Sequence, residues 1–232
     1  MKYESLSPRL KLIASLVPSG SVPVDVGTDH GYIPAWLLKH GVVSRCLATD
    51  INKGPLASAE RTLADAGVRD RCDLILCDGL AGCTEGCADV VIIAGMGGDN
   101  ISGILERAPW ARDCELIILQ PMSKAEKLRS WLCVNGYGIF DERLVMDSGK
   151  IYPVICARRA EETCSLSEAE KHTGALELVL KEALFEGFLN ELILKYERAV
   201  ESQRTARTAS VHLTEMQELL EAFRKIREEN FT

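Results

Sequence analysis

The chain of 232 residues lacks several patterns that define common classes of protein. It contains no apolar run of the length that a membrane-spanning helix requires, and no signal-peptide pattern at its start. No Cys-x-x-Cys pair occurs among the nine cysteines, so common zinc-site spacings are missing and we expect no metal. These absences favour a soluble, cytoplasmic protein without a membrane partner.

Two nucleotide-binding fingerprints are also missing. The glycine-rich stretch that begins at Gly95 is not followed by Gly-Lys-Ser/Thr, so it is not a Walker P-loop. The absence of Gly-x-Gly-x-x-Gly disfavours a nicotinamide-dependent oxidoreductase. The net charge of −7 does not favour nucleic-acid binding, although local patches rather than the total charge decide such binding.

Strand-like and helix-like segments alternate between residues 22 and 131, a pattern typical of βαβ units and a parallel sheet. The expected strands are Val22–Val26, Arg45–Thr49, Asp73–Cys77, Asp89–Ala94 and Glu115–Leu119. The expected helices are Pro34–Lys39, Pro55–Ala66, Asn100–Arg107 and Lys124–Val134, the last with a capping box of Ser123 and Glu126. Two further strand-like runs, Tyr137–Met146 and Ile151–Arg158, flank turn residues and predict a hairpin. An α/β protein with a seven-stranded, Rossmann-like class I methyltransferase sheet is therefore expected.

The composition changes after Arg159, where glycine and strand-forming residues become rare. Ser167 and Glu170 form a capping box, and apolar residues then recur at helical spacing over residues 176–200 and again over residues 213–226. Two such stripes predict a helical coiled-coil hairpin. We expect a donor-binding domain at residues 1–160 and the hairpin at residues 161–232.

The turn after the first expected strand is rich in glycine and carboxylates. A diphosphate site needs backbone N–H groups and little negative charge, but Asp25 and Asp29 stand where the phosphates would lie. A cationic ligand without phosphate fits better, and S-adenosylmethionine, with its sulfonium and ammonium groups, is such a ligand. The residues of this turn that we expect to bind it are Asp25, Gly27, Thr28, His30 and Gly31.

The other strand ends carry matching polar or glycine-rich turns, and ligands of such sheets bind beyond these carboxyl ends. Asp50 is expected to accept hydrogen bonds from the ribose hydroxyls, Ile51 to pack on adenine, and Asp78 to accept from the adenine amino group. Glycines after the fourth strand would let a flat base approach the donor, and the amide of Gln120 would bond the base edge. The remaining donor-site candidates are Asn52, Cys77, Gly79, Leu80, Ala94, Gly95 and Met96, and those for the base are Gly97, Gly98 and Pro121.

Several motifs together resemble the bacterial tRNA (adenine-22-N1)-methyltransferases over nearly the whole chain. They are Leu6-Ser7-Pro8-Arg9-Leu10, the stretch DVGTDHGYIP at 25–34, Asn52-Lys53-Gly54-Pro55, IIAGMGG at 92–98, Ile117-Ile118-Leu119-Gln120-Pro121 and Gly149-Lys150-Ile151-Tyr152. One departure is Met122, where the family often has asparagine.

The resemblance implies methylation of adenine N1 in tRNA, with Asp29 as the catalytic carboxylate and Arg9 on the substrate side. Positive charge for tRNA phosphates would come from Arg158, Arg159, Arg204 and Arg207. Two alternatives stay open: a methyltransferase for another RNA or a small molecule, and a non-catalytic module that binds the donor or RNA. A monomer or a weak homodimer is expected.

Overall fold

The computed structural model describes residues 4–160, 165–205 and 211–231. It divides into two compact units, Met1–Cys164 and Ser165–Thr232. None of the described helices has the length and apolar character needed to cross a membrane. Within the same residues, no three His, Cys, Asp or Glu side chains gather as potential metal ligands.

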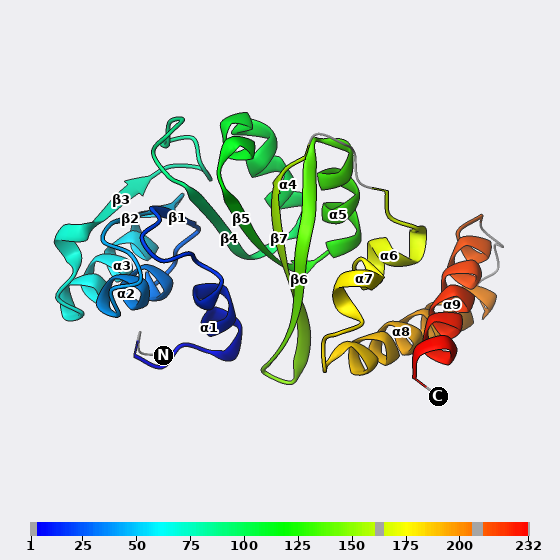
Figure 1. Cartoon of the computed structure of the whole chain (residues 1–232). Helices are drawn as coiled ribbons and strands as arrows, with labels where there is room; N and C mark the ends of the chain where they lie inside the picture. Colours follow the sequence, from blue (N-terminus) through cyan, green and yellow to red (C-terminus); the bar gives the residue numbers. More distant parts are fainter. Residues whose placement is uncertain (1–3, 161–164, 206–210, 232) are drawn as a thin grey trace. The chain divides into compact units, whose positions relative to one another are not determined.

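The first unit is built on a seven-stranded sheet with the order β3-β2-β1-β4-β5-β7-β6 (Figure 1). Its strands are β1 Pro23–Val26, β2 Cys46–Asp50, β3 Cys72–Leu76, β4 Val90–Gly97, β5 Leu116–Ser123, β6 Tyr137–Asp147 and β7 Lys150–Arg159. Strands β1 to β5 are parallel, whereas β7 is antiparallel to both β5 and β6. This sheet confirms the expected fold. The strand order reverses between β1 and β4, which is where such sheets bind ligands.

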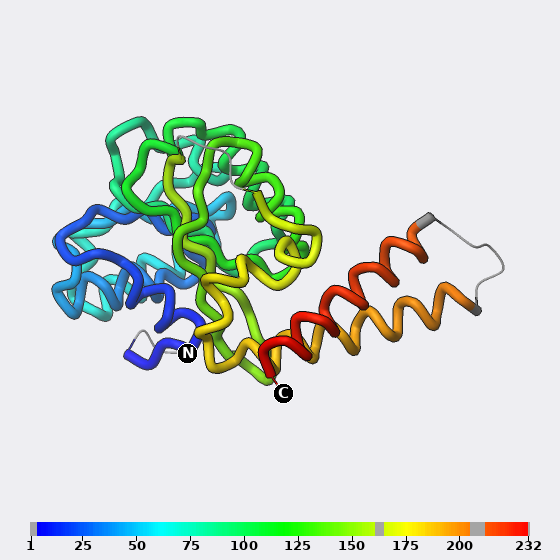
Figure 2. Tube along the Cα trace, turned by 45° about the vertical axis from the view of Figure 1, so that its right-hand side comes forward, coloured from blue at the N-terminus to red at the C-terminus, as the bar shows by residue number. Residues whose placement is uncertain are grey.

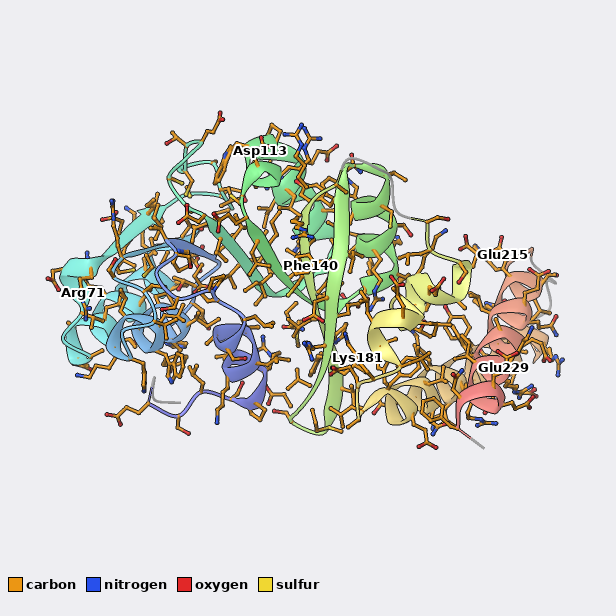
Figure 3. The ribbon with its side chains drawn as sticks, in the orientation of Figure 1. Arg71, Asp113, Phe140, Lys181, Glu215 and Glu229 are labelled. Atoms are coloured by element: carbon orange, nitrogen blue, oxygen red, sulfur yellow. The ribbon has the colours of Figure 1, made fainter. Side chains whose placement is uncertain are left out.

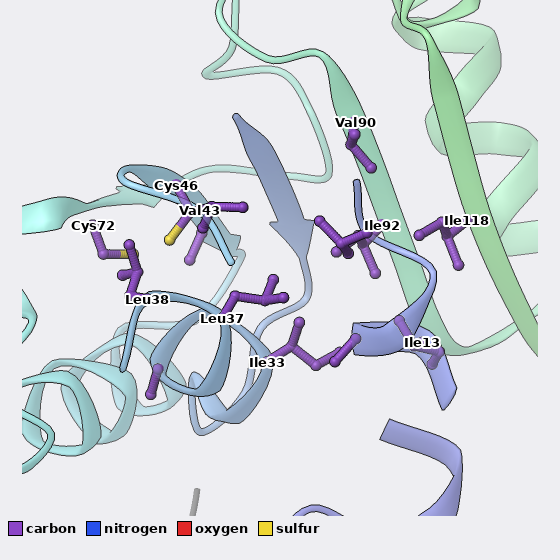
Figure 4. Close-up of a cluster of buried hydrophobic side chains, with 14 of the residues drawn as sticks. Ile13, Ile33, Leu37, Leu38, Val43, Cys46, Cys72, Val90, Ile92 and Ile118 are labelled. Atoms are coloured by element: carbon purple, nitrogen blue, oxygen red, sulfur yellow. The ribbon is translucent and has the colours of Figure 1, made fainter. Parts of the chain in front are cut away.

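Helices cover both faces of this sheet because its central strands are apolar on both sides. The helices are α1 Pro8–Ser15, α2 Tyr32–Lys39, α3 Lys53–Asp65, α4 Gly98–Arg107 and α5 Ala125–Val134, with short 3-10 turns η1 Arg69–Arg71 and η2 Pro109–Asp113. Ile92 faces the core shared with α1, α2 and α3, part of which Figure 4 shows. Its neighbours Val91 and Ile93 face the core shared with α4 and α5, as the alternation of a strand requires.

Two expected element boundaries near the site are wrong. Strands β4 and β5 run on to Gly97 and Ser123, so the polar and glycine-rich residues of these turns still pair, with irregular register, as strand. Ser123 therefore does not cap α5. The residue before α5 is Lys124, and no side chain caps the helix.

The second unit contains α6 Glu168–Thr173, α7 Leu176–Val179, α8 Phe185–Thr205 and α9 Val211–Asn230. The capping box of Ser167 and Glu170 is present at α6, and α8 and α9 run side by side as the expected hairpin (Figure 2). The continuous helix expected from Leu176 onward is wrong, because a turn separates α7 from α8. Val179 and Phe185 are both fully buried, although six residues apart on one helix they would face different sides.

Candidate functional site

A cavity of about 560 Å³ lies over the carboxyl ends of β1, β2 and β4, beside α4. It brings together most of the residues that the sequence assigns to the donor. These are Gly27, Asp50, Ile51, Asn52, Asp78, Gly79, Ala94, Gly95 and Met96. A second cavity of about 240 Å³ shares Gly27, Ala94 and Gly95 with the first, and adds Arg9, Asp25, Thr28, Asp29 and His30. The two cavities thus adjoin at the end of β1.

Asp25 is a buried carboxylate at the end of β1. It accepts a hydrogen bond of 2.6 Å from the hydroxyl of Thr28. Burial raises the pKa of Asp25 to about 6, although the bond from Thr28 favours the charged form. A cation bound in the second cavity would restore the charge on this carboxylate.

The backbone of the first turn is left-handed at three residues, Gly27, Asp29 and Gly31. At Gly27 a Cβ atom would lie 2.2 Å from the terminal methyl of Met96, so a side chain there would crowd the shared part of the two cavities. A glycine fits at position 31 for a different reason, because a Cβ there would lie 2.9 Å from the Cβ of Ala59 in α3. The structure therefore gives Gly31 a role in helix packing rather than a cavity-lining one.

Asp29 is one of three non-glycine residues with a positive φ in the described part of the chain, and its φ is 53°. Its side chain is 71% exposed, and its Oδ2 lies 3.7 Å from Nε2 of His30. An aspartate tolerates this backbone better than most residues. The turn thus presents an exposed carboxylate at the smaller cavity, next to the buried one of Asp25.

The ends of β2 and β3 supply the far part of the larger cavity. Asp50 Oδ1 accepts a bond of 2.8 Å from the backbone N–H of Asn52, which fixes the carboxylate beside Ile51. Ile51 is 62% exposed, unusual for its type, and offers an apolar face to a flat ligand. Asp78 is held by Arg107 of α4, whose Nη2 lies 3.2 Å from Oδ1.

Gln120 is fully buried at the end of β5. Its Oε1 accepts hydrogen bonds from the backbone N–H of Gly95 at 3.1 Å and from Nη1 of Arg9 at 2.8 Å. Its Nε2 donates to the carbonyl of the neighbouring, buried Pro121 at 3.0 Å. These bonds hold Gly95 and Arg9 in place beside the smaller cavity, and the expected contact between Gln120 and a base stays a prediction. Arg9 is also 3.6 Å from Asp147.

Some predicted residues are not brought to this mouth. Leu80 is buried in the core under α4, and Cys77 points its thiol at the carbonyl of Gly79. Arg158 and Arg159 lie at the opposite edge of the sheet, because β7 is antiparallel to β5. Arg158 covers Phe140, and Arg159 pairs with Asp113 of η2. Phe140 and Asp113 are labelled in Figure 3.

The second unit has its own groove, of about 370 Å³, between α8 and α9. Arg204 lines it together with Arg224, and Arg224 Nη2 lies 2.7 Å from Oε1 of Glu197. Arg207 lies outside the described residues. Three glutamates, Glu197, Glu201 and Glu221, line the groove against Arg204 and Arg224, so its charged side chains sum to a net negative charge.

Sequence reasoning missed the face of α4 that closes the larger cavity. Its residues are Asp99, Asn100, Gly103, Ile104 and Arg107. Their spacing of three and four residues, starting at a glycine-rich turn, is the signal that would have found them. Gly98 is buried at the start of this helix and packs against the residue that follows β5, because a Cβ at Gly98 would lie 2.3 Å from the carbonyl oxygen of Lys124.

The strand order, the terminal antiparallel hairpin and the carboxylate-lined mouth define a class I methyltransferase. The family model described as a methyltransferase domain matches residues 6–155. The chain is 34% identical over 177 residues to the tRNA (adenine(22)-N(1))-methyltransferase of Bacillus subtilis, which covers 76% of this chain and 74% of that protein.

Solved structures agree with this relationship. The crystal structure of the B. subtilis m1A22 tRNA methyltransferase TrmK has a TM-score of 0.85 and 30% identity, with 96% of this chain and 98% of that chain covered. A Streptococcus pneumoniae protein in complex with S-adenosyl-L-methionine has a TM-score of 0.84 and 28% identity, with 96% and 99% covered. The chain belongs to the tRNA (adenine(22)-N(1))-methyltransferase family.

Proposed function

We propose that the protein transfers the methyl group of S-adenosylmethionine to N1 of adenine 22 in tRNA. The observation that carries this proposal is the pair of adjoining cavities at the end of β1. One offers Asp50, Ile51 and Asp78 to a nucleoside, and the other offers buried Asp25 to a cation. The B. subtilis relative is named as a methyltransferase for N1 of adenine 22 in tRNA.

The residues of the mouth fit this donor. Asp25 would hold its ammonium group, Asp50 its ribose hydroxyls and Asp78 its adenine amino group. Gly27 leaves room for the chain between them, because any side chain there would enter the space shared by both cavities. When bound, the donor supplies a methyl group on a positively charged sulfur.

The protein's own residues then align the acceptor. Adenine N1 is a fair nucleophile, so holding it in line with the methyl group supplies most of the rate. The methylated base is cationic and loses a proton from its amino group. The exposed carboxylate of Asp29 stabilises that charge and takes the proton.

Access to N1 sets a further requirement, because this atom takes part in Watson–Crick pairing. The target base must therefore be unpaired or turned out of its helix. Gly95 and Gly97 leave space for a flat base at the end of β4. Arg9, held by Gln120, is the cation closest to that end within the smaller cavity. Arg204 and Arg207 of the hairpin remain candidates for phosphate contacts.

The test is transfer of labelled methyl groups to unmodified tRNA, followed by mapping of the modified base. Asp29→Asn keeps a residue that tolerates the left-handed backbone and removes only the charge. We expect donor binding within about twofold of wild type and turnover reduced by about 100-fold, the lower range for loss of a general base. Equal turnover would remove Asp29 from the mechanism. Tight donor binding without transfer to any tRNA would favour a non-catalytic module, and transfer to another acceptor would favour a different substrate.

A further inference from the structure

Lys124 directly follows β5, and it has a backbone conformation that lysine rarely adopts. Its φ is 56° and its ψ is 38°, in the left-handed region. Among the described residues, the other non-glycine residues with positive φ are Asp29, at the end of β1, and Ser148, in the turn between β6 and β7. Such conformations persist where the surroundings impose them, and they concentrate at functional sites.

The neighbouring strand end imposes this conformation. The carbonyl oxygen of Lys124 lies against Gly98, where a Cβ would come within 2.3 Å of it. One residue earlier, the hydroxyl of Ser123 lies 3.3 Å from the Cβ position of Gly97. The ends of β4 and β5 are therefore in backbone contact, and this contact fixes where the Lys124 side chain leaves the chain.

The ammonium group of Lys124 forms an ion pair with Asp99, at the start of α4. Lys124 is 50% exposed and Asp99 47% exposed, and Asp99 lines the larger cavity. The ion pair holds the pKa of Asp99 below its usual value, so this carboxylate stays charged at neutral pH. A carboxylate without a cationic partner would repel the phosphates of an RNA that approaches the cavity. By neutralising Asp99, Lys124 therefore reduces this repulsion even without a direct contact to RNA.

We propose that Lys124 binds an RNA phosphate next to the target adenine, and that its ion pair with Asp99 holds it in place for this contact. A lysine suits this role, because its ammonium group has three donors and can bind a phosphate while it still neutralises Asp99. The proposal rests on the proposed function, since it takes the β4 and β5 ends as the side on which the base enters.

A purely structural role is the competing explanation, in which the ion pair only clasps α4 to the end of β5. Three substitutions separate the two. Lys124→Met removes the charge, and Lys124→Arg keeps it. Lys124→Gly removes the charge and relieves the left-handed backbone, so it leaves the junction unstrained. Arg45→Met is the matched control, because Arg45 and Asp73 form a somewhat more exposed ion pair at the opposite edge of the sheet.

The experiment measures tRNA affinity of the full-length protein at several salt concentrations, together with donor affinity by calorimetry and thermal stability. For Lys124→Met and Lys124→Gly we expect about tenfold weaker tRNA binding and a salt dependence reduced by about one counterion. Donor affinity should stay unchanged, Lys124→Gly should keep or raise the melting temperature, and Lys124→Arg should bind tRNA within about threefold of wild type. Arg45→Met should leave tRNA affinity and its salt dependence unchanged.

The proposal is wrong if Lys124→Met and Lys124→Gly bind tRNA with the affinity and salt dependence of Arg45→Met. It is also wrong if the loss follows thermal stability rather than charge, so that Lys124→Gly binds tRNA normally. The proposed function fails separately, through wild-type protein that binds tRNA and donor but transfers no methyl group. In that case the salt dependence of tRNA binding still decides the role of Lys124.

Discussion

The two edges of the sheet carry ion pairs of similar type and exposure in different surroundings. At the amino edge, Arg45 pairs with Asp73 across the beginnings of β2 and β3. At the carboxyl edge, Arg107 pairs with Asp78, and both residues line the larger cavity. Exposed pairs contribute little to stability wherever they lie. Because both are arginine–aspartate pairs, only their positions at opposite ends of the strands distinguish the pair that lines the cavity from the pair that does not.

The largest difference between the edges is expected at two glycines with nearly the same backbone. Gly27 has a φ of 68°, and a Cβ there would lie 2.2 Å from the terminal methyl of Met96. Gly41, before β2, has a φ of 67° and nothing within 4 Å of its Cβ position. Gly27→Ala should lower kcat/KM for the donor by about 100-fold, because the displaced Met96 and the new methyl occupy the shared space. Initial rates over a range of donor concentrations measure this.

Gly41→Ala is the control for backbone strain. Both substitutions put alanine in the left-handed region and should lower the free energy of unfolding by about 1–2 kcal/mol. Urea titrations of both variants check that expectation. If Gly41→Ala lowers kcat/KM for the donor as much as Gly27→Ala does, backbone strain and not crowding explains the effect. The two glycines would then not differ in their importance for donor binding.

A smaller effect, of about tenfold, is expected from Asp25→Asn, because one charge-assisted contact to the donor is lost. In the donor-free protein, by contrast, the buried charge of Asp25 should lower the free energy of unfolding at neutral pH. The folded pKa of Asp25 is about 6, above its ordinary value of 3.8, so the native state binds more protons than the unfolded state between these values. The free energy of unfolding therefore falls as pH rises from about 4 to 6, by roughly 3 kcal/mol.

Urea unfolding of the donor-free protein at pH 4 and pH 8 spans most of this fall. Asp25→Asn should remove that part of the slope and be more stable than wild type at pH 8, while Asn can still accept the bond from Thr28. Wild-type affinity for the donor should rise with pH through 6, as the carboxylate ionises. A variant with an unchanged slope would show that Asp25 is charged in the free protein.

The sequence predicts the fold well because apolar alternation and turn residues are local signals. The carboxylates of Asp25 and Asp50 lie at strand ends and that of Asp78 lies just after one, so the topology alone brings them to one edge. The end of β5 could not be predicted, because Ser123 looks like a helix cap and becomes strand only through pairing with Gly97. The roles of Gln120 and Lys124 depend on partners 111 and 25 residues away. The turn between α7 and α8, which lies between the buried Val179 and Phe185, likewise follows from tertiary packing.

The smallest expected difference concerns the two exposed arginines. Arg107→Met and Arg45→Met should each change the free energy of unfolding by less than about 1 kcal/mol, since both pairs are exposed. Only Arg107→Met should raise the Kd of the donor, by about threefold, because Asp78 loses the partner that orients it toward the larger cavity. Calorimetric titration with S-adenosylhomocysteine isolates this effect from turnover. Tighter binding by Arg107→Met would reverse the interpretation: the arginine would then compete with adenine for Asp78, and the ion pair would act as a closed state of the cavity that the nucleoside must open.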